Sequence, residues 1–293
     1  MGKIKERFAQ WCETKAAQSK AGLMIESAEK QWKKRRGKGQ PHKLPGELII
    51  SLTSYPPRFP FVERTVKSLL SQSVKPDRII LWVAEQDSAS LPAGVVGLQK
   101  HGLEIRTCAD MRSYKKLVPA VLAFPEAFIV TADDDFYYGP TWLAAYVDAY
   151  RNSEEILCQR ARCASVGYDG QFTPYASWPL PRKEISAPAV MPVGVEGVFY
   201  PPQALPQEAL DSGVFMQVCP EADDLWFYWM GSRNGRRFRK IGGDPRLDRH
   251  WPGSQDTALY RDNVDGGGND KQIASLIDAM GPPAGFAGLR KAA

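Results

Sequence analysis

Short apolar runs alternate with amphipathic stretches along the first half of this chain. The strand patterns lie at 47–53, 78–83, 103–106 and 128–131, all mainly apolar except 103–106 (Leu-Glu-Ile-Arg), and helical patterns lie at 61–72 and 116–124. Strands that alternate with helices predict an α/β fold with a parallel, doubly wound sheet. Residues 79–83 are all apolar, as expected for a strand buried on both faces. Ligands of such sheets bind beside the carboxyl ends of the strands, so the residues at those ends are the first candidates for a site.

The fourth run opens directly onto three consecutive carboxylates, Asp133, Asp134 and Asp135. Three anions at the exit of a buried strand repel one another unless solvent or a cation neutralises them. Hard oxygen ligands suit Mg²⁺ or Mn²⁺, which keep positions open for water and substrate phosphates. The ordinary alternative is a solvated acidic turn, because charge clusters usually lie on surfaces. The buried strand before the aspartates favours a metal.

The other strand ends carry groups that a nucleoside diphosphate requires: cations for its phosphates and a flat face for its base or ribose. Besides Asp133 and Asp134, the donor-binding candidates are Thr53, Tyr55, Arg58, Glu85, Arg112, Lys115 and Lys116. Arg112 and the two lysines can meet phosphate, and Tyr55 can stack on the base. Each has an ordinary alternative, since the lysines also suit a solvated helix start and Tyr55 also suits packing in a proline-rich turn.

A second acidic cluster, Glu221, Asp223 and Asp224, opens an aromatic helix at 225–230. The helix dipole alone favours carboxylates at a helix start, which is the structural explanation. Because the helix itself is apolar, the cluster is expected to border a cleft. A partly desolvated carboxylate there can take the proton of an acceptor hydroxyl.

The last third of the chain adds three further candidates. His250 can reach the metal if the chain reverses after the second acidic cluster, although a lone histidine is more often structural. The glycines at 266–268 are either a mobile lid or the loop that Asn269 or Asp270 uses to cap a final helix. Trp226 is either a platform for the acceptor or part of the core.

The chain divides by composition into three parts. A basic helical arm and linker occupy 1–46, a donor-binding half occupies 47–155, and a loop-rich, acceptor-binding half that ends in a helix occupies 156–293. The arm holds twelve Lys or Arg against four Asp or Glu, a net charge of +8, whereas the remainder has a net charge of −3. The body therefore offers no basic face to nucleic acid.

The basic arm has two interpretations. The cluster 33–36, beside Trp32, can dock on anionic lipid headgroups, at about 1 kcal/mol for each basic residue. Alternatively the arm is a solvated helix that packs on the body or on a sister subunit. No run reaches the length of a bilayer span, and five cysteines without a CxxC pair fit a reducing compartment. We therefore expect a cytoplasmic protein, with peripheral attachment to the inner face of the plasma membrane through the arm.

Six segments together resemble a bacterial polysaccharide glycosyltransferase of GT-A fold, similar to family 2. They are ISLTSYPPR at 50–58, RSYKKLVPA at 112–120, IVTADDDFYY at 129–138, VGVEGVFYPP at 193–202, PEADDLWF at 220–227 and GGGND at 266–270. The resemblance covers about residues 47–280 and leaves out the arm. It is specific for the fold and the reaction class, but not for the sugar.

The resemblance implies a role for each matching residue. The triple aspartate matches the Asp-x-Asp motif, so Asp133 and Asp135 would hold the metal and the donor diphosphate, and His250 falls where some members carry a late metal ligand. The second acidic cluster matches the segment that supplies the base in inverting members. The catalytic candidates are therefore Asp224, Asp223 and Glu221, and the acceptor-side loop corresponds to Gly194 and Gly197, with Trp226 nearby.

The implied reaction is the transfer of a sugar from a nucleotide-diphosphate donor to a hydroxyl of a glycan or lipid-linked acceptor, with inversion and with Mn²⁺ or Mg²⁺. Two alternatives stay open at this point. A sugar-nucleotide nucleotidyltransferase would need a glycine-rich, basic loop after the first strand, and the segment 54–58 has one arginine and no glycine. A non-catalytic carbohydrate-binding protein would not be stabilised by a nucleoside diphosphate.

Overall fold

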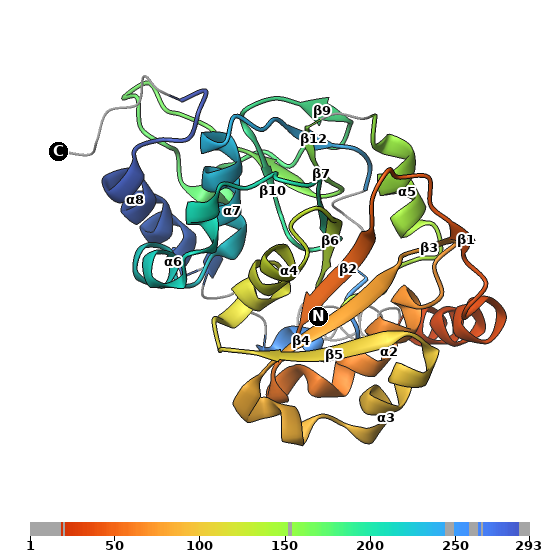
Figure 1. Cartoon of the computed structure of the whole chain (residues 1–293). Helices are drawn as coiled ribbons and strands as arrows, with labels where there is room; N and C mark the ends of the chain where they lie inside the picture. The colour runs from red at the N-terminus through yellow and green to blue at the C-terminus, as the bar shows by residue number, and fades with distance from the viewer. Residues whose placement is uncertain are drawn as a thin grey trace, which may run out of the picture.

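The computed structural model describes residues 19, 21–151, 154–243, 249–257, 263–264 and 266–286. Its centre is an eight-stranded mixed sheet with the order β5-β4-β2-β6-β11-β7-β12-β9 (Figure 1). The strands are β2 (Leu48–Thr53), β4 (Arg78–Ala84), β5 (Leu103–Cys108), β6 (Phe128–Ala132), β7 (Ile156–Cys158), β9 (Ile185–Ser186), β11 (Val198–Tyr200) and β12 (Phe238–Lys240). Two small two-stranded sheets flank it, formed by β1 (Gln40–Pro41) with β3 (Val74–Lys75) and by β8 (Ala161–Cys163) with β10 (Val190–Pro192).

The first half of the sheet confirms the predicted parallel arrangement. Strands β5, β4, β2 and β6 are all parallel, and they coincide with the four predicted strands to within two residues at each end. In the register, Leu52 of β2 pairs with Ala132 of β6. The carboxyl ends of these two strands therefore lie side by side, which places the residues that follow each strand next to one another.

The second half of the chain extends the same sheet. Strand β11 is antiparallel to both β6 and β7, whereas β12 is parallel to β7 and antiparallel to β9. These strands are two or three residues long, so this half is rich in loops, as expected. The sequence did not predict that its short strands continue the central sheet. Short strands leave no periodic pattern long enough to be recognised in the sequence.

Helices cover both faces of the sheet, as a doubly wound arrangement requires. The α-helices are α2 (Phe59–Leu69), α3 (Ala93–Val96), α4 (Val118–Ala123), α5 (Trp142–Ala149), α6 (Ser212–Val218), α7 (Asp223–Arg233) and α8 (Gly268–Met280), besides a helix at 21–35. Ile49 of β2 belongs to the hydrophobic cluster that includes α4 and α7, whereas its neighbours Leu48 and Ile50 belong to the cluster that includes α2. Alternate residues of one strand thus fill two cores.

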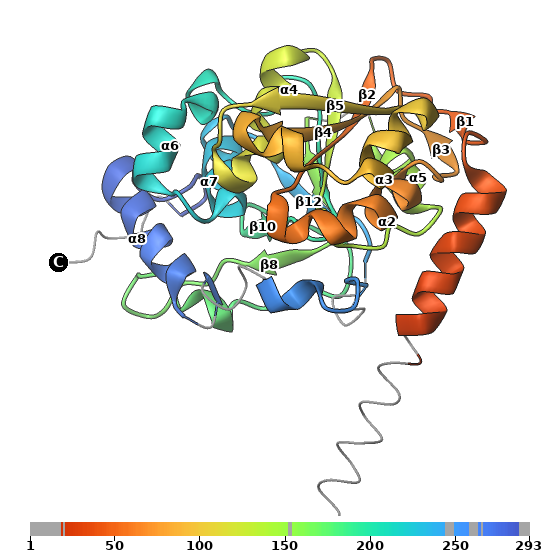
Figure 2. The same ribbon diagram turned by 90° about the horizontal axis from the view of Figure 1, so that it is seen from below.

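Within the part of the arm that the structure describes, residues 21–35 form a helix, drawn in red at the edge of the molecule in Figure 2. Residues 1–18 and 20, where the prediction also placed helix, lie outside the described residues. None of the helices formed by the described residues is long and apolar enough to cross a membrane.

Candidate active site

The triple aspartate stands at the carboxyl end of β6, and an arginine from the neighbouring strand end holds two of its carboxylates. Arg58 lies in the 3-10 helix η1 (Pro56–Arg58) just after β2. Its Nε lies 3.2 Å from Asp134 Oδ1, its Nη2 lies 3.0 Å from Asp135 Oδ2, and its Nη1 donates to Ser254 O at 2.6 Å. Arg58, expected to bind the donor, thus neutralises the aspartates from within the protein.

Two residues that the sequence analysis missed complete this corner. Ser54 Oγ donates to Asp134 Oδ2 at 2.5 Å, and Gln255 Nε2 donates to Asp135 Oδ2 at 2.8 Å. The pairing of β2 with β6 brings Ser54 beside Asp134, so a predicted register would have found it; nothing in the sequence marks Gln255. Burial raises the pKa of Asp134 to about 7 and raises that of Asp135, although Arg58 opposes both shifts.

A buried lysine joins the two acidic clusters. Lys116 ends the 3-10 helix η4 (Arg112–Lys116), and its Nζ lies 3.0 Å from Asp223 Oδ2, 3.5 Å from Asp133 Oδ1 and 3.7 Å from Asp224 Oδ1. Burial alone would lower the pKa of this lysine, but the carboxylates, first that of Asp223, raise it well above its ordinary value. Lys116 therefore remains charged and brings carboxylates from distant parts of the sequence to one point.

Asp224 is held by a backbone donor at the start of α7. The amide of Gly194 donates to Asp224 Oδ2 at 2.7 Å. A Cβ on Gly194 would lie 2.7 Å from Asp224 Oδ1 and 2.8 Å from Lys116 Nζ, so a larger residue would push these two side chains out of their present positions. Burial raises the pKa of Asp224 to about 7, and the amide and Lys116 oppose that shift.

The carboxylates around Lys116 differ in their exposure to solvent. The side chains of Asp133 and Asp224 are 27% and 29% exposed, whereas that of Asp223 is only 10% exposed. A molecule from solvent can therefore reach Asp133 and Asp224. Asp223 serves chiefly as the partner of Lys116.

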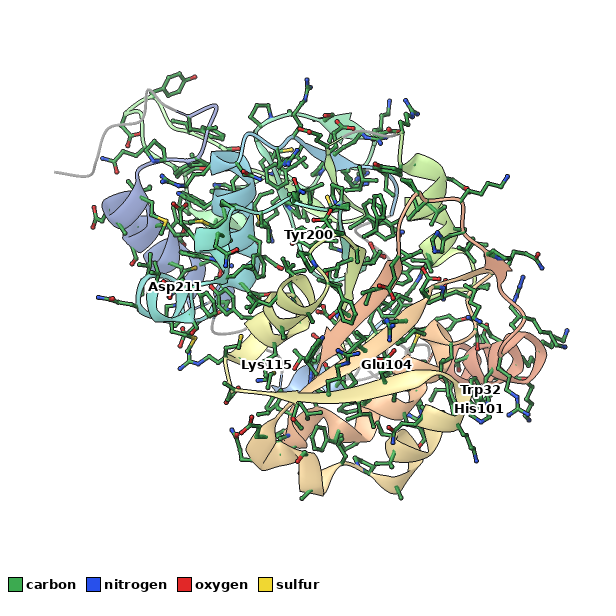
Figure 3. The ribbon with its side chains drawn as sticks, in the orientation of Figure 1. Trp32, His101, Glu104, Lys115, Tyr200 and Asp211 are labelled. Carbon is green, nitrogen blue, oxygen red and sulfur yellow. The ribbon has the colours of Figure 1, made fainter. Side chains whose placement is uncertain are left out.

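Several other predicted residues lie apart from this cluster. Arg112 and Glu221 form an exposed pair at 3.3 Å, and Lys115, labelled in Figure 3, is bound to Asp110. Trp226 is fully buried and donates to Ala209 O at 3.0 Å. Its ring therefore belongs to the core, as do its neighbours, since residues 225–232 of α7 are all buried.

The remaining candidates lie outside the cluster around Lys116. Thr53 Oγ1 donates to Trp82 O at 2.9 Å, Tyr55 is 38% exposed, and Glu85 opens the exposed 3-10 helix η2 (Glu85–Ser90). Gly197 has a φ of +86°, and a Cβ there would lie 2.6 Å from Thr131 O. Because Gly197 has no Cβ, the backbone just before β11 can lie close to β6.

The predicted metal ligands are only partly brought together. His250 forms an isolated β-bridge with Phe136, which follows Asp135 in the sequence. Asp133 instead faces Lys116. Among the described residues, no group of three or more His, Cys, Asp or Glu side chains is arranged to hold a metal by itself.

Asp224 makes the stability of the fold depend on pH in a defined direction. Its pKa is about 7 in the folded chain, against about 4 for an unfolded aspartate, so the folded chain binds a proton that the unfolded chain has already released. The free energy of unfolding therefore falls as the pH rises from about 4 through about 7. We expect a higher Tm at about pH 5.5 than at about pH 8 without divalent metal, and a shallower fall in Asp224→Asn. Asp148→Asn, which removes an exposed aspartate, is the control. If the Tm falls equally steeply with pH in the wild-type chain and in Asp224→Asn, the prediction is wrong.

Comparison with known proteins gives little beyond the geometry. No protein-family model matches the sequence, and no curated protein matches it. Among solved structures, the chain is similar to the mannosyltransferase PcManGT from Pyrobaculum calidifontis, described in complex with GDP-Man and Mn²⁺, with 13% identity and a TM-score of 0.43. The match covers 92% of this chain and 86% of that one.

Proposed function

We propose that this chain is a metal-dependent glycosyltransferase of GT-A fold, which transfers a sugar from a nucleotide-diphosphate donor to an acceptor hydroxyl. One observation carries the proposal: Lys116 joins a partly exposed carboxylate at the end of β6 to a partly exposed carboxylate at the start of α7. The first, Asp133, lies where ligands of parallel sheets bind. The second, Asp224, has a raised pKa suited to proton transfer near neutral pH.

The residues present fit a divalent metal whose coordination the donor completes. Mg²⁺ and Mn²⁺ are commonly held by one or two protein side chains together with substrate phosphates and water, so a preformed group of three ligands is not required. Asp135 and His250, with Asp133, are the side chains that would hold it. Burial is the main cause of the raised pKa of Asp134 and Asp135, so a cation bound beside them would favour their ionised, metal-binding form. When bound, the metal would stabilise the charge of the departing diphosphate.

Asp224 would act as the base. The acceptor oxygen forms a bond to the anomeric carbon, the bond from that carbon to the diphosphate breaks, and the hydroxyl proton passes to Asp224. A single displacement of this kind inverts the anomeric configuration. Gly194 N–H fixes one oxygen of the carboxylate, and Lys116 favours its ionised form against the effect of burial.

The acceptor is proposed to be a glycan or a lipid-linked saccharide in cell-surface polysaccharide synthesis, and the protein is proposed to work in the cytoplasm beside the membrane. The support is the basic end of helix 21–35, where Lys33, Lys34 and Arg36 are exposed. Arg36 lies over Trp32, whose ring meets His101 of the body, so the basic end is attached to the fold (Figure 3). Charges on a fixed surface can attract anionic headgroups.

A thermal melt with nucleotides tests the proposed function. We expect UDP or GDP with Mn²⁺ to raise the Tm by several degrees, because a ligand that binds only the folded chain adds to its stability. Neither the nucleotide without metal nor AMP with Mn²⁺ should match this shift. If no diphosphate shifts the Tm, and a panel of sugar nucleotides is not hydrolysed, the proposal is wrong.

A further inference from the structure

The helix at 21–35 reaches the segment that carries the triple aspartate, although the two are far apart in the sequence. Gln31 is buried on the inner face of this helix. Its Oε1 accepts a hydrogen bond from Tyr137 Oη at 2.7 Å, and its Nε2 contacts Tyr138 O at 3.4 Å and Ser68 O at 3.3 Å. Ser27 Oγ, one turn earlier, lies 3.3 Å from the same tyrosine hydroxyl.

These contacts are connected to the aspartates through Tyr138. The carbonyl of Tyr138 is bound by Gln31 and by Gln72, while its buried hydroxyl accepts the amide of Asp133 at 2.8 Å. The helix at 21–35, called the arm helix below, thus contacts the backbone of Tyr138, and Asp133 contacts its hydroxyl. Movement of its carbonyl would be passed to the aspartate through a rigid buried ring.

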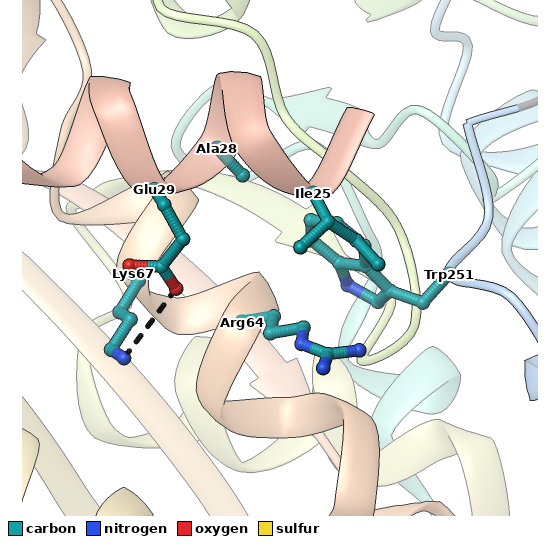
Figure 4. Close-up of a pocket in the computed structure, with 6 residues that line it drawn as sticks. All are labelled: Ile25, Ala28, Glu29, Arg64, Lys67 and Trp251. Carbon is teal, nitrogen blue, oxygen red and sulfur yellow. Dashed lines mark ion pairs between the residues drawn. The ribbon is translucent and has the colours of Figure 1, made fainter. Parts of the chain in front are cut away.

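A second connection passes through Trp251, which lies under the same helix. Figure 4 shows Ile25 of the helix against the indole of Trp251, with α2 on the other side. The amide of Trp251 donates to Asp135 O at 2.8 Å, and its Nε1 donates to Thr65 Oγ1, which in turn donates to Asp134 O. The ion pair between Glu29 and Lys67, at 3.9 Å, holds the helix to α2.

From these contacts we propose that the arm helix positions the segment 133–138, and that Gln31 is the positioning residue. The helix is therefore part of the structure that holds the triple aspartate, rather than an independent extension. Only the expected effect on nucleotide binding rests on the proposed function. The mechanical claim concerns the segment itself and can be measured without any ligand.

Hydrogen exchange in the full chain tests the mechanical claim. Gln31→Met keeps the length of the side chain and removes its polar atoms, and Tyr137→Phe removes the hydroxyl from the other side of the shortest contact. We expect amide exchange at 133–138 to rise by about tenfold in each variant, while exchange in β4 stays unchanged. Exchange at 133–138 should be only slightly faster in the double variant than in either single variant, because both changes remove the same contact. Gln99→Met, an exposed glutamine on the 3-10 helix η3 (Gly97–His101), is the matched control.

Binding of GDP and UDP with Mn²⁺ to the same proteins gives the second readout. If Gln31 positions the donor site, Gln31→Met should raise the Kd for the nucleotide by about tenfold or more. Unchanged exchange at 133–138 in both Gln31→Met and Tyr137→Phe would overturn the inference, whatever the nucleotides do. Faster exchange confined to 133–138 supports it, and if the wild-type chain then binds neither nucleotide, the proposed function is at fault.

Discussion

Asp224→Asn is expected to lower kcat by about a hundredfold to ten-thousandfold, while the Kd for the donor changes by less than about threefold. Asparagine keeps an acceptor for the amide of Gly194, which lies 2.7 Å away, but it cannot take a proton. Lys116 keeps Asp223 and Asp133 as partners, so the local fold should persist. The measurements are single-turnover transfer and donor titration of the same preparation.

Asp223→Asn and Glu221→Gln are the matched comparisons for this experiment. Asp223 is mainly buried against Lys116, and Glu221 pairs with Arg112 at the exposed surface. Both should retain more activity than Asp224→Asn. Full activity in Asp224→Asn, with a large loss in one of the other two, would move the base to that residue.

Much of the fold follows from local patterns in the sequence. Strands β2, β4 and β6 are mainly apolar runs, β5 is a shorter and more polar pattern, and all four alternate with helical patterns, so both the elements and the sheet type could be predicted. The position of Asp133, Asp134 and Asp135 at a carboxyl end followed from the same argument. The short strands β7, β11 and β12 could not be predicted, because three residues define no period.

The site was predicted in its residue types but not in its pairing. Lys116, expected on the phosphates, instead joins carboxylates from both acidic clusters, and Arg58 binds Asp134 and Asp135. Pairings between distant segments depend on three-dimensional packing that no local window contains. Gln31 is the extreme case, because an isolated glutamine in a helix carries no signal until the segment it contacts is known.

Loss of the aspartates at the end of β6 is the other large expected effect. Asp133→Asn and Asp135→Asn should each reduce transfer by on the order of a thousandfold, which corresponds to about 4 kcal/mol of transition-state stabilisation. Both variants should stay folded, because Arg58 retains Asp134 and Lys116 retains Asp223 and Asp224. Asp148→Asn, at an exposed position of α5, controls for the loss of one negative charge.

Chelation separates a role in metal binding from a role in folding. EDTA should abolish transfer by the wild-type chain, and added Mn²⁺ should restore it, whereas Mn²⁺ should restore neither Asp133→Asn nor Asp135→Asn. Because Asp135 already pairs with Arg58 at 3.0 Å, a metal must compete with that arginine, and Arg58→Gln should bind Mn²⁺ more tightly while folding less stably. Normal turnover of either aspartate variant in EDTA would show that the carboxylates serve only to hold Arg58 and Lys116, and the reaction would then need another site.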